Sequence, residues 1–307
     1  MGLTKKVRTG VIGAGYMGAL HCKAYSQNEN SDFAGIFEPS DISASQAVSK
    51  YKIKRFDSIV QLLECSDAVS VAAPTTLHFE IAKECIAKGV NILMEKPIAA
   101  NMDEASQILR MLEGKNLVFA LGYIERFNPA SIKMFELLKD KKILSFESER
   151  LAPPAPRAND VSVIFDLMIH DIDMILALLN YQRPVSIQAT GRAVSGPVIN
   201  DASCSLTFDR GVEAKLVSSK ISDKKSRTIK VVCRDCVVEA DLMSKRVVYS
   251  SGQESQTFDA EGEEPIKAEI SDFILAVQNH SSPKVGAKEA YLSFETADKI
   301  EKAISKG

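Results

Sequence analysis

Residues 166–173 carry side chains suited to acid–base chemistry. On a helix, Asp166, His170 and Asp173 fall at positions i, i+4 and i+7 and share one stripe. A histidine can accept a hydroxyl proton near neutral pH, and a carboxylate beside it can orient the ring and support its charged form. Because apolar residues crowd the other faces, we expect this stripe to line a wet cleft. The alternative is a structural histidine bonded to Asp166 or Asp173.

A second reactive group, Lys96, lies in the tripeptide E-K-P at residues 95–97. It follows an apolar run typical of a buried parallel strand, and open α/β sheets bind ligands at the carboxyl ends of such strands. A lysine there can donate hydrogen bonds to a substrate oxygen and stabilise developing negative charge. The alternative is an ordinary surface lysine after a strand.

The segment 13–18 has the spacing of a dinucleotide-binding turn, with Tyr16 and Met17 between its last two glycines. Gly13 allows the tight turn, Gly15 lets the backbone approach a pyrophosphate, and Gly18 allows close packing of helix on strand. The start of the following helix favours phosphate charge. The sequence therefore predicts a dinucleotide cofactor at this turn.

Glu38 lies twenty residues after the last glycine, at the end of the next apolar run. An acid at this place can bind the adenosine ribose hydroxyls, and its charge repels a 2′-phosphate. Residues 39–41 supply no arginine that could accept such a phosphate. We therefore predict NAD rather than NADP.

The elements that must position these residues change in kind along the chain. Short apolar runs alternate with helical patterns over residues 1–121, which predicts βαβ units and a parallel sheet. Residues 122–307 contain strand-like segments of alternating polarity and two closing amphipathic helices. The predicted fold class is α/β, with a Rossmann domain (1–121) and a second α/β domain with a mostly antiparallel open sheet (122–307). The strands expected in the second domain span residues 185–190, 202–208, 212–217, 229–233, 237–241 and 246–250, with a hairpin turn at 209–211.

Composition excludes several classes of partner. The 38 basic and 40 acidic residues give a net charge of −2, which offers no field for nucleic acid or an anionic membrane. No run approaches the length of a membrane span, and a cytoplasmic location with reduced cysteines is expected. We predict no metal site, since the pair Cys233 and Cys236 lacks further ligands nearby. His21 and His280 join no cluster in the sequence, so they are expected to be structural or exposed.

Together these segments resemble the glucose-fructose oxidoreductase, inositol dehydrogenase and MocA family. The resemblance covers essentially the whole chain and rests on V-I-G-A-G-Y-M-G near the start, A-P-T-T-L-H at 73–78, E-K-P at 95–97 and D-x-x-x-H-D-x-D at 166–173. It implies an NAD-dependent enzyme with Lys96 and His170 as catalytic residues and Asp166 beside the histidine. It also implies a homodimer or homotetramer formed through the open sheet. The further residues that it places beside the cofactor are Pro74, Thr75, His78 and Glu95, with Lys96 itself.

A narrower resemblance, to UDP-N-acetylglucosamine 3-dehydrogenases, rests on G-Y-I-E-R-F-N-P-A at 122–130 and on the 166–173 helix. It implies oxidation of the sugar 3-hydroxyl to a ketone, ahead of a separate aminotransferase. Arg126, Arg150 or Arg157 is then expected to meet the diphosphate, because guanidinium groups suit phosphate oxygens. The residues expected to bind the substrate are Tyr123, Arg126, Asn128, Arg157, Asp166 and His170. Two alternatives remain: another sugar or an inositol as substrate, and a regulatory protein that binds NAD and a sugar without turnover.

Overall fold

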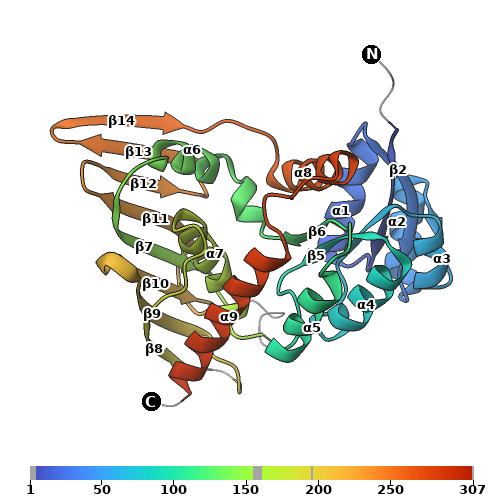
Figure 1. The fold of residues 1–307 in the computed structure, drawn as a ribbon, viewed down its shortest axis with the longest axis horizontal. Coiled ribbons are helices and arrows are strands. Elements are labelled where there is room, and N and C mark those ends of the chain that lie inside the picture. Colours follow the sequence, from blue (N-terminus) through green and yellow to red (C-terminus); the bar gives the residue numbers. More distant parts are fainter. Residues whose placement is uncertain (1–4, 155–160, 195, 306–307) are drawn as a thin grey trace. The chain divides into compact units, whose positions relative to one another are not determined.

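The computed structural model describes residues 5–154, 161–194 and 196–305. These divide into two compact units, one made of residues up to 124 with 264–291, the other of residues 125–263 with 292 onward. Each unit has its own sheet (Figure 1). No helix within the described ranges is both long enough and apolar enough to cross a membrane.

The first unit is a parallel sheet with the strand order β3-β2-β1-β4-β5-β6. Its strands are β1 (Val7–Ile12), β2 (Ser31–Phe37), β3 (Lys54–Arg55), β4 (Ala68–Val71), β5 (Asn91–Glu95) and β6 (Phe119–Gly122). Its helices are α1 (Tyr16–Gln27), α2 (Asp41–Tyr51), α3 (Ile59–Glu64), α4 (His78–Lys88), α5 (Met102–Leu112) and α8 (Pro265–Asn279). Helix α1 packs with α2 and α8, whereas α4 packs with α3 and α5. The order reverses between β1 and β4, where doubly wound sheets bind their ligands.

Helix α8 shows where the linear division of the chain differs from the structure. Its apolar side chains Ile266, Ile270 and Phe273 belong to the core of the Rossmann unit. The helix therefore returns to the first unit from far along the sequence, although the predicted boundary assigned all residues after 121 to the second domain. Burial of this apolar stripe against α1 gives the physical reason.

The second unit is a mixed sheet with the order β14-β13-β12-β11-β7-β10-β9-β8, in which only the β7–β10 pair is parallel. Its strands are β7 (Ile143–Leu151), β8 (Ser186–Arg192), β9 (Asp201–Thr207), β10 (Glu213–Ser219), β11 (Ser226–Cys233), β12 (Val237–Asp241), β13 (Arg246–Ser251) and β14 (Glu254–Asp259). Its helices are α6 (Pro129–Leu138), α7 (Ile169–Leu178) and most of α9 (Ala287–Ile304). The predicted α/β class and the mostly antiparallel sheet are confirmed.

The predicted hairpin turn of this sheet is present, and a second turn joins two further strands. β9 and β10 form an antiparallel pair joined at residues 209–211. The amide of Cys233 donates to the Cys236 carbonyl (2.8 Å) and closes the turn between β11 and β12. The cysteine pair therefore has a place in a hairpin.

Candidate active site

The glycine turn after β1 has the geometry expected of a phosphate-binding loop. Gly13 has φ of +90°, and a Cβ there would lie 2.7 Å from the Ala72 carbonyl oxygen. At Gly18 a Cβ would lie 1.8 Å from the Gly13 carbonyl oxygen, so any side chain would push α1 off the strand. A Cβ at Gly15 would meet nothing within 4 Å. Protein packing thus explains two of the glycines, and the open space at Gly15 is what an approaching pyrophosphate needs.

The first residues of α1 have different environments. Gly15 is the N-cap and provides no side-chain hydrogen bond, so the first amides of the helix are not capped by it. Tyr16 is 76% exposed, whereas Met17 packs against the core of the unit. This arrangement leaves the positive end of the helix facing the glycine turn.

Glu38, at the end of β2, is buried and directed at this turn. One carboxylate oxygen accepts a hydrogen bond from the amide of Ala14 (2.6 Å), and the other accepts from the amide of Ser40 (2.8 Å). Carboxylate oxygens can accept more than one hydrogen bond each, so Glu38 keeps acceptor capacity for ribose hydroxyls. A 2′-phosphate placed there would meet its negative charge.

Arg55 is a neighbour of Glu38 that the sequence reasoning missed, because it comes from a separate strand. Its guanidinium donates to the carbonyls of Glu38 and Pro39 and pairs with Asp41 at 2.6 Å. These contacts hold the loop after β2 in shape. The Arg55 guanidinium is therefore paired with Asp41 and is not an unpaired cation directed at the ribose position.

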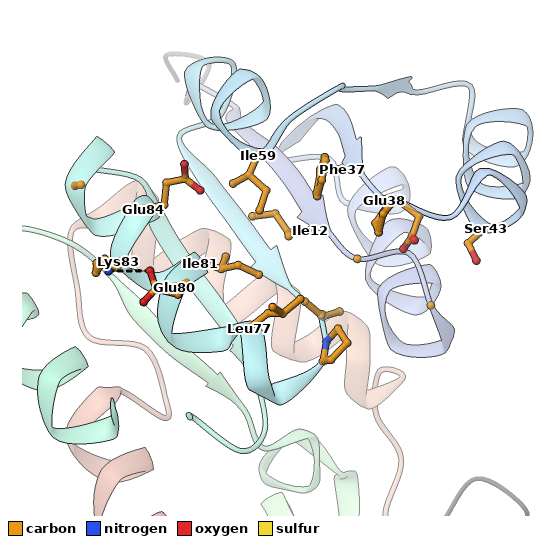
Figure 2. A pocket seen from close by; sticks show the side chains of 17 residues that line it. Ile12, Phe37, Glu38, Ser43, Ile59, Leu77, Glu80, Ile81, Lys83 and Glu84 are labelled. Atoms are coloured by element: carbon orange, nitrogen blue, oxygen red, sulfur yellow. Dashed lines mark ion pairs between the residues drawn. The ribbon is translucent and has the colours of Figure 1, made fainter. Parts of the chain in front are cut away.

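A cavity of about 860 Å³ lies at the carboxyl ends of β1, β2 and β4. Figure 2 shows Glu38 and Ser43 toward one side of it and Glu80, Lys83 and Glu84 toward the other. Its apolar wall is made by Ile12, Phe37, Ile59, Leu77 and Ile81. The predicted residues Gly13, Gly15, Glu38 and Pro74 all line it. Its volume lies within the range of small-molecule sites, and the apolar wall beside a ribose-binding acid suits an adenosine group.

The loops after β4 and β5 are tied together by His78. Its Nδ1 lies 2.8 Å from the Pro97 carbonyl oxygen, and its Nε2 lies 2.9 Å from that of Ala73. The side chain is buried, and burial lowers its pKa. Pro74 and Thr75 begin the short helix η1 (Thr75–Leu77) in the same loop. His78 therefore holds the cofactor loop and the E-K-P tripeptide in a fixed relation.

Glu95 and Lys96 stand at the end of β5, as predicted. The amide of Lys96 donates to the Glu95 carboxylate (3.3 Å), and a Cβ at Gly122 would lie 3.2 Å from that carboxylate. His21 contacts the same carboxylate through Nε2 at 2.9 Å. The expectation that His21 joins no cluster was wrong. Its partners lie on strands distant in the sequence, so spacing alone could not reveal them.

His170 and Asp166 lie where a π-helical turn, η3 (Ile164–Met168), passes into α7. His170 is 9% exposed, and the Asp166 side chain is 35% exposed. Lys220, which follows β10, pairs with Asp166 at 3.1 Å and donates to the Val161 carbonyl at 2.6 Å. Lys220 carries no sequence signal, and folding alone brings it to Asp166. π-Turns inside helices recur at functional sites.

The polar stripe of this helix is not a single wet surface. Asp173 is fully buried and accepts hydrogen bonds from Tyr181 (2.9 Å) and Arg126 (3.3 Å). The π-turn also changes the angular spacing between residues 166 and 170. The prediction of one stripe lining a cleft was therefore wrong for Asp173, whose role is internal pairing.

Two of the three arginines expected at a diphosphate are engaged inside the second unit. Arg150 is 3% exposed and pairs with Glu125 at 2.8 Å and with Asp171 at 2.7 Å. Arg126 pairs with Asp173 and lies over the ring of Phe135. Because buried charges require compensation, these guanidiniums neutralise internal acids. The expected contact of Arg126 or Arg150 with the diphosphate stays a prediction, and in this structure both guanidiniums are engaged by internal acids.

The remaining predicted substrate residues differ in their surroundings. Asn128 is buried: its Oδ1 caps α6 by accepting from the amide of Ala130, and its Nδ2 donates to Glu125 and the Leu242 carbonyl. Asn128 thus has a capping role in the structure, and its role at the substrate stays a prediction. Tyr123 is buried at the end of β6. Arg157 lies outside the described residues.

Comparison with known proteins agrees with this geometry. Residues 7–123 match the oxidoreductase family with an NAD-binding Rossmann fold, and residues 144–239 match the GFO/IDH/MocA C-terminal domain. The UDP-N-acetylglucosamine 3-dehydrogenase of Acidithiobacillus ferrooxidans is 32% identical over 284 residues, which cover 89% of this chain and 90% of the relative. Inositol 2-dehydrogenase of Rhizobium meliloti is 28% identical over 64% of this chain and 62% of its own length.

Solved structures show the same pattern. The structure of the Acidithiobacillus ferrooxidans enzyme superposes with a TM-score of 0.93 at 30% identity, covering 98% of each chain. Levoglucosan dehydrogenase in complex with NADH and levoglucosan shares the fold, with a TM-score of 0.88 at 18% identity and 98% coverage of each chain. The glycine turn, Glu38 and the E-K-P loop thus lie in a fold that these known proteins share. This chain belongs to the Gfo/Idh/MocA family of NAD-dependent oxidoreductases that act on CH–OH groups.

Proposed function

We propose that this chain oxidises the 3-hydroxyl of UDP-N-acetylglucosamine to a ketone. The observation that carries the proposal is the 32% identity, over nine-tenths of both chains, to an enzyme named for that reaction. The residues that the reaction needs, Lys96, Asp166 and His170, are all present in this chain.

Each of these residues has a role that its chemistry supports. His170 accepts the hydroxyl proton as general base, and Asp166 orients the imidazole. Lys96 donates a hydrogen bond to the reacting oxygen and stabilises its developing charge. Lys220, ion-paired with Asp166 at 3.1 Å, keeps that carboxylate in place. NAD, when bound, supplies the hydride acceptor.

The rest of the substrate site is proposed more narrowly than the sequence indicated. Since Arg126 and Arg150 are engaged by internal acids, Arg157 is the remaining candidate among the three for the diphosphate. Tyr123 is proposed to contact the sugar. The ketone product suits a downstream aminotransferase, and the open face of the second sheet is proposed to form a homo-oligomer.

The test is NADH formation by purified protein with UDP-N-acetylglucosamine, free sugars and inositols, each with a ketone trap because alcohol oxidation is unfavourable. We expect His170→Ala to lower kcat by roughly 10²–10⁴-fold, the usual range for loss of a general base. Lys96→Met is assayed with the same substrate as a second variant. Wild-type turnover by His170→Ala would remove the assigned role, and turnover with an inositol alone would replace the proposed substrate.

A further inference from the structure

Behind the E-K-P loop, the Rossmann unit buries five polar side chains that the proposed reaction does not use directly. We call them the Glu95 cluster: Tyr25 and His21 from α1, Ser70 from β4, Glu95 from β5 and Glu269 from α8. All five are at most 8% exposed. Polar groups buried together in this number need an internal arrangement that satisfies them.

Four members of the cluster form one hydrogen-bonded chain. The Tyr25 hydroxyl lies 2.8 Å from Ser70 Oγ, which lies 2.9 Å from His21 Nδ1. His21 Nε2 lies 2.9 Å from Glu95 Oε1. An ionised carboxylate only accepts, so His21 Nε2 donates to Glu95; with a neutral ring, Nδ1 then accepts from Ser70, and Ser70 accepts from Tyr25. One anionic end thus sets the direction of every bond.

Glu269 completes the cluster from α8. It is 2% exposed, and within the described part of the chain neither of its carboxyl oxygens has a hydrogen-bond partner. One of these oxygens lies within 4.8 Å of the His21 and Glu95 atoms that face it. A second negative charge in this space would be unfavourable, since no described residue donates a hydrogen bond to the Glu269 carboxyl group. Burial and the nearby Glu95 and Asp272 carboxylates raise the pKa of Glu269 well above its ordinary value.

The cluster reaches the reaction through Glu95. The second oxygen of Glu95 accepts from the amide of Lys96 (3.3 Å), while Gly122 leaves room for the carboxylate, since a Cβ there would lie 3.2 Å away. On the other side of Lys96, the Pro97 carbonyl is fixed by His78. The Lys96 backbone is therefore held from both sides.

We propose that Tyr25, Ser70, His21 and an uncharged Glu269 are positioning residues that fix the Glu95 carboxylate and, through it, the backbone of Lys96. This inference rests on the proposed function, because it assigns Lys96 to the reacting oxygen. Glu269 lies within 4.8 Å of the Glu95 carboxylate, and an uncharged Glu269 adds no second negative charge beside it. Misplacement of a catalytic group by about 1 Å can lower a rate by roughly 10²-fold.

The kinetic test compares variants that remove a donor with variants that keep it. His21→Leu and Glu269→Leu are expected to lower kcat by about 10–100-fold while the KM for NAD changes little. His21→Gln retains an N–H donor, and Glu269→Gln keeps an uncharged polar side chain of similar size, so both are expected to recover most of that loss. Ile270→Val, in the same core but outside the hydrogen-bonded chain, loses stability and is expected to keep kcat. Equal losses in the Leu and Gln variants would overturn the proposal, as would wild-type kcat in folded His21→Leu.

Two further measurements separate this proposal from the proposed function. Hydrogen exchange of the Lys96 amide requires no turnover: it should accelerate in His21→Leu and not in His21→Gln, and unchanged exchange in His21→Leu would overturn the positioning role. Infrared spectra should contain a protonated-carboxyl band that Glu269→Gln removes. A stoichiometric divalent metal ion in the purified protein, lost in Glu269→Gln, would replace the proposal with a metal site. If UDP-N-acetylglucosamine is not oxidised but amide exchange responds as expected, only the proposed function fails.

Discussion

The two units bury acidic side chains in opposite ways. In the second unit, Glu125 and Asp171 pair with Arg150 at 2.8 and 2.7 Å, and Asp173 pairs with Arg126 at 3.3 Å. In the Rossmann unit, Glu95 and Glu269 share a site with His21, and no arginine is among the groups that contact them in the described residues. The second unit pairs these buried acids with arginines, whereas in the Rossmann unit burial and the nearby Glu95 and Asp272 carboxylates raise the pKa of Glu269.

This difference bears on function. An arginine remains charged at all physiological pH values, so the ion pairs of the second unit form a permanent scaffold. The need to compensate buried acids also explains why Arg126 and Arg150, which the sequence suggested as phosphate ligands, are paired inside the second unit.

The largest effect is expected from Arg150→Met. Removal of the guanidinium leaves Glu125 and Asp171 buried with their main cation gone, since Arg227 reaches only Glu125. Breaking a buried pair in this way typically costs about 3–5 kcal/mol. Urea unfolding would measure the loss of stability, and a change of less than about 1 kcal/mol would show that the pairing does not hold the unit together.

Glu269→Gln should change how stability depends on pH. The pKa of Glu269 is raised above its ordinary value near 4.5, so its favourable contribution is complete below that pH and is lost as pH rises toward the folded-state pKa. Across that window wild type should lose stability relative to the Gln variant by up to about 1.4 kcal/mol per pH unit. The titratable groups near it include His21, Tyr25, Glu95 and Asp272. Parallel stability curves for the two proteins would contradict a protonated Glu269.

Glu38→Ala tests a third solution in the Rossmann unit, a buried carboxylate held by backbone amides. A hydrogen bond to a charged group is worth about 1.5–3 kcal/mol, so the preference for NAD over NADP should fall by roughly 10–100-fold. Binding of both cofactors measured by calorimetry gives the ratio. An unchanged ratio would place the ribose elsewhere.

The smallest effect is expected at the surface. Arg8 pairs with Asp67 at 2.6 Å, but its side chain is 46% exposed. Exposed pairs contribute about 0–1 kcal/mol because water and salt screen them. Arg8→Ala should therefore barely change the free energy of unfolding, and a loss as large as that of Arg150→Met would remove burial as the deciding factor.

Local sequence patterns predicted the fold well, but they did not predict which residues far apart in the sequence would pair. The glycine turn, Glu38 and the E-K-P loop depend on neighbours in the sequence, and each lies at the end of a strand as the sequence predicted. Strand β7 escaped notice because its inward positions include the polar residues Ser148 and Arg150. Such positions are buried only because Arg150 meets acids from other elements.

The same limit applies to the site. The partners of His21, Arg126 and Arg150 lie dozens of residues away, and no spacing rule connects them. Helix α8 carried a clear apolar stripe, but the stripe did not reveal which unit it covers. Element type was therefore predictable from periodicity, whereas the choice of partner depended on the folded chain.

The most direct test of the account uses UDP-N-acetylglucosamine deuterated at C3 of the sugar, incubated with the protein, NAD and a ketone trap. If the sugar is oxidised at C3, the deuterium appears in the reduced cofactor and NADH formation slows by an isotope effect. Reduced cofactor without deuterium would move the oxidation to another carbon. No reduced cofactor with this substrate, while NAD binds and another sugar or an inositol is oxidised, would contradict the proposed function.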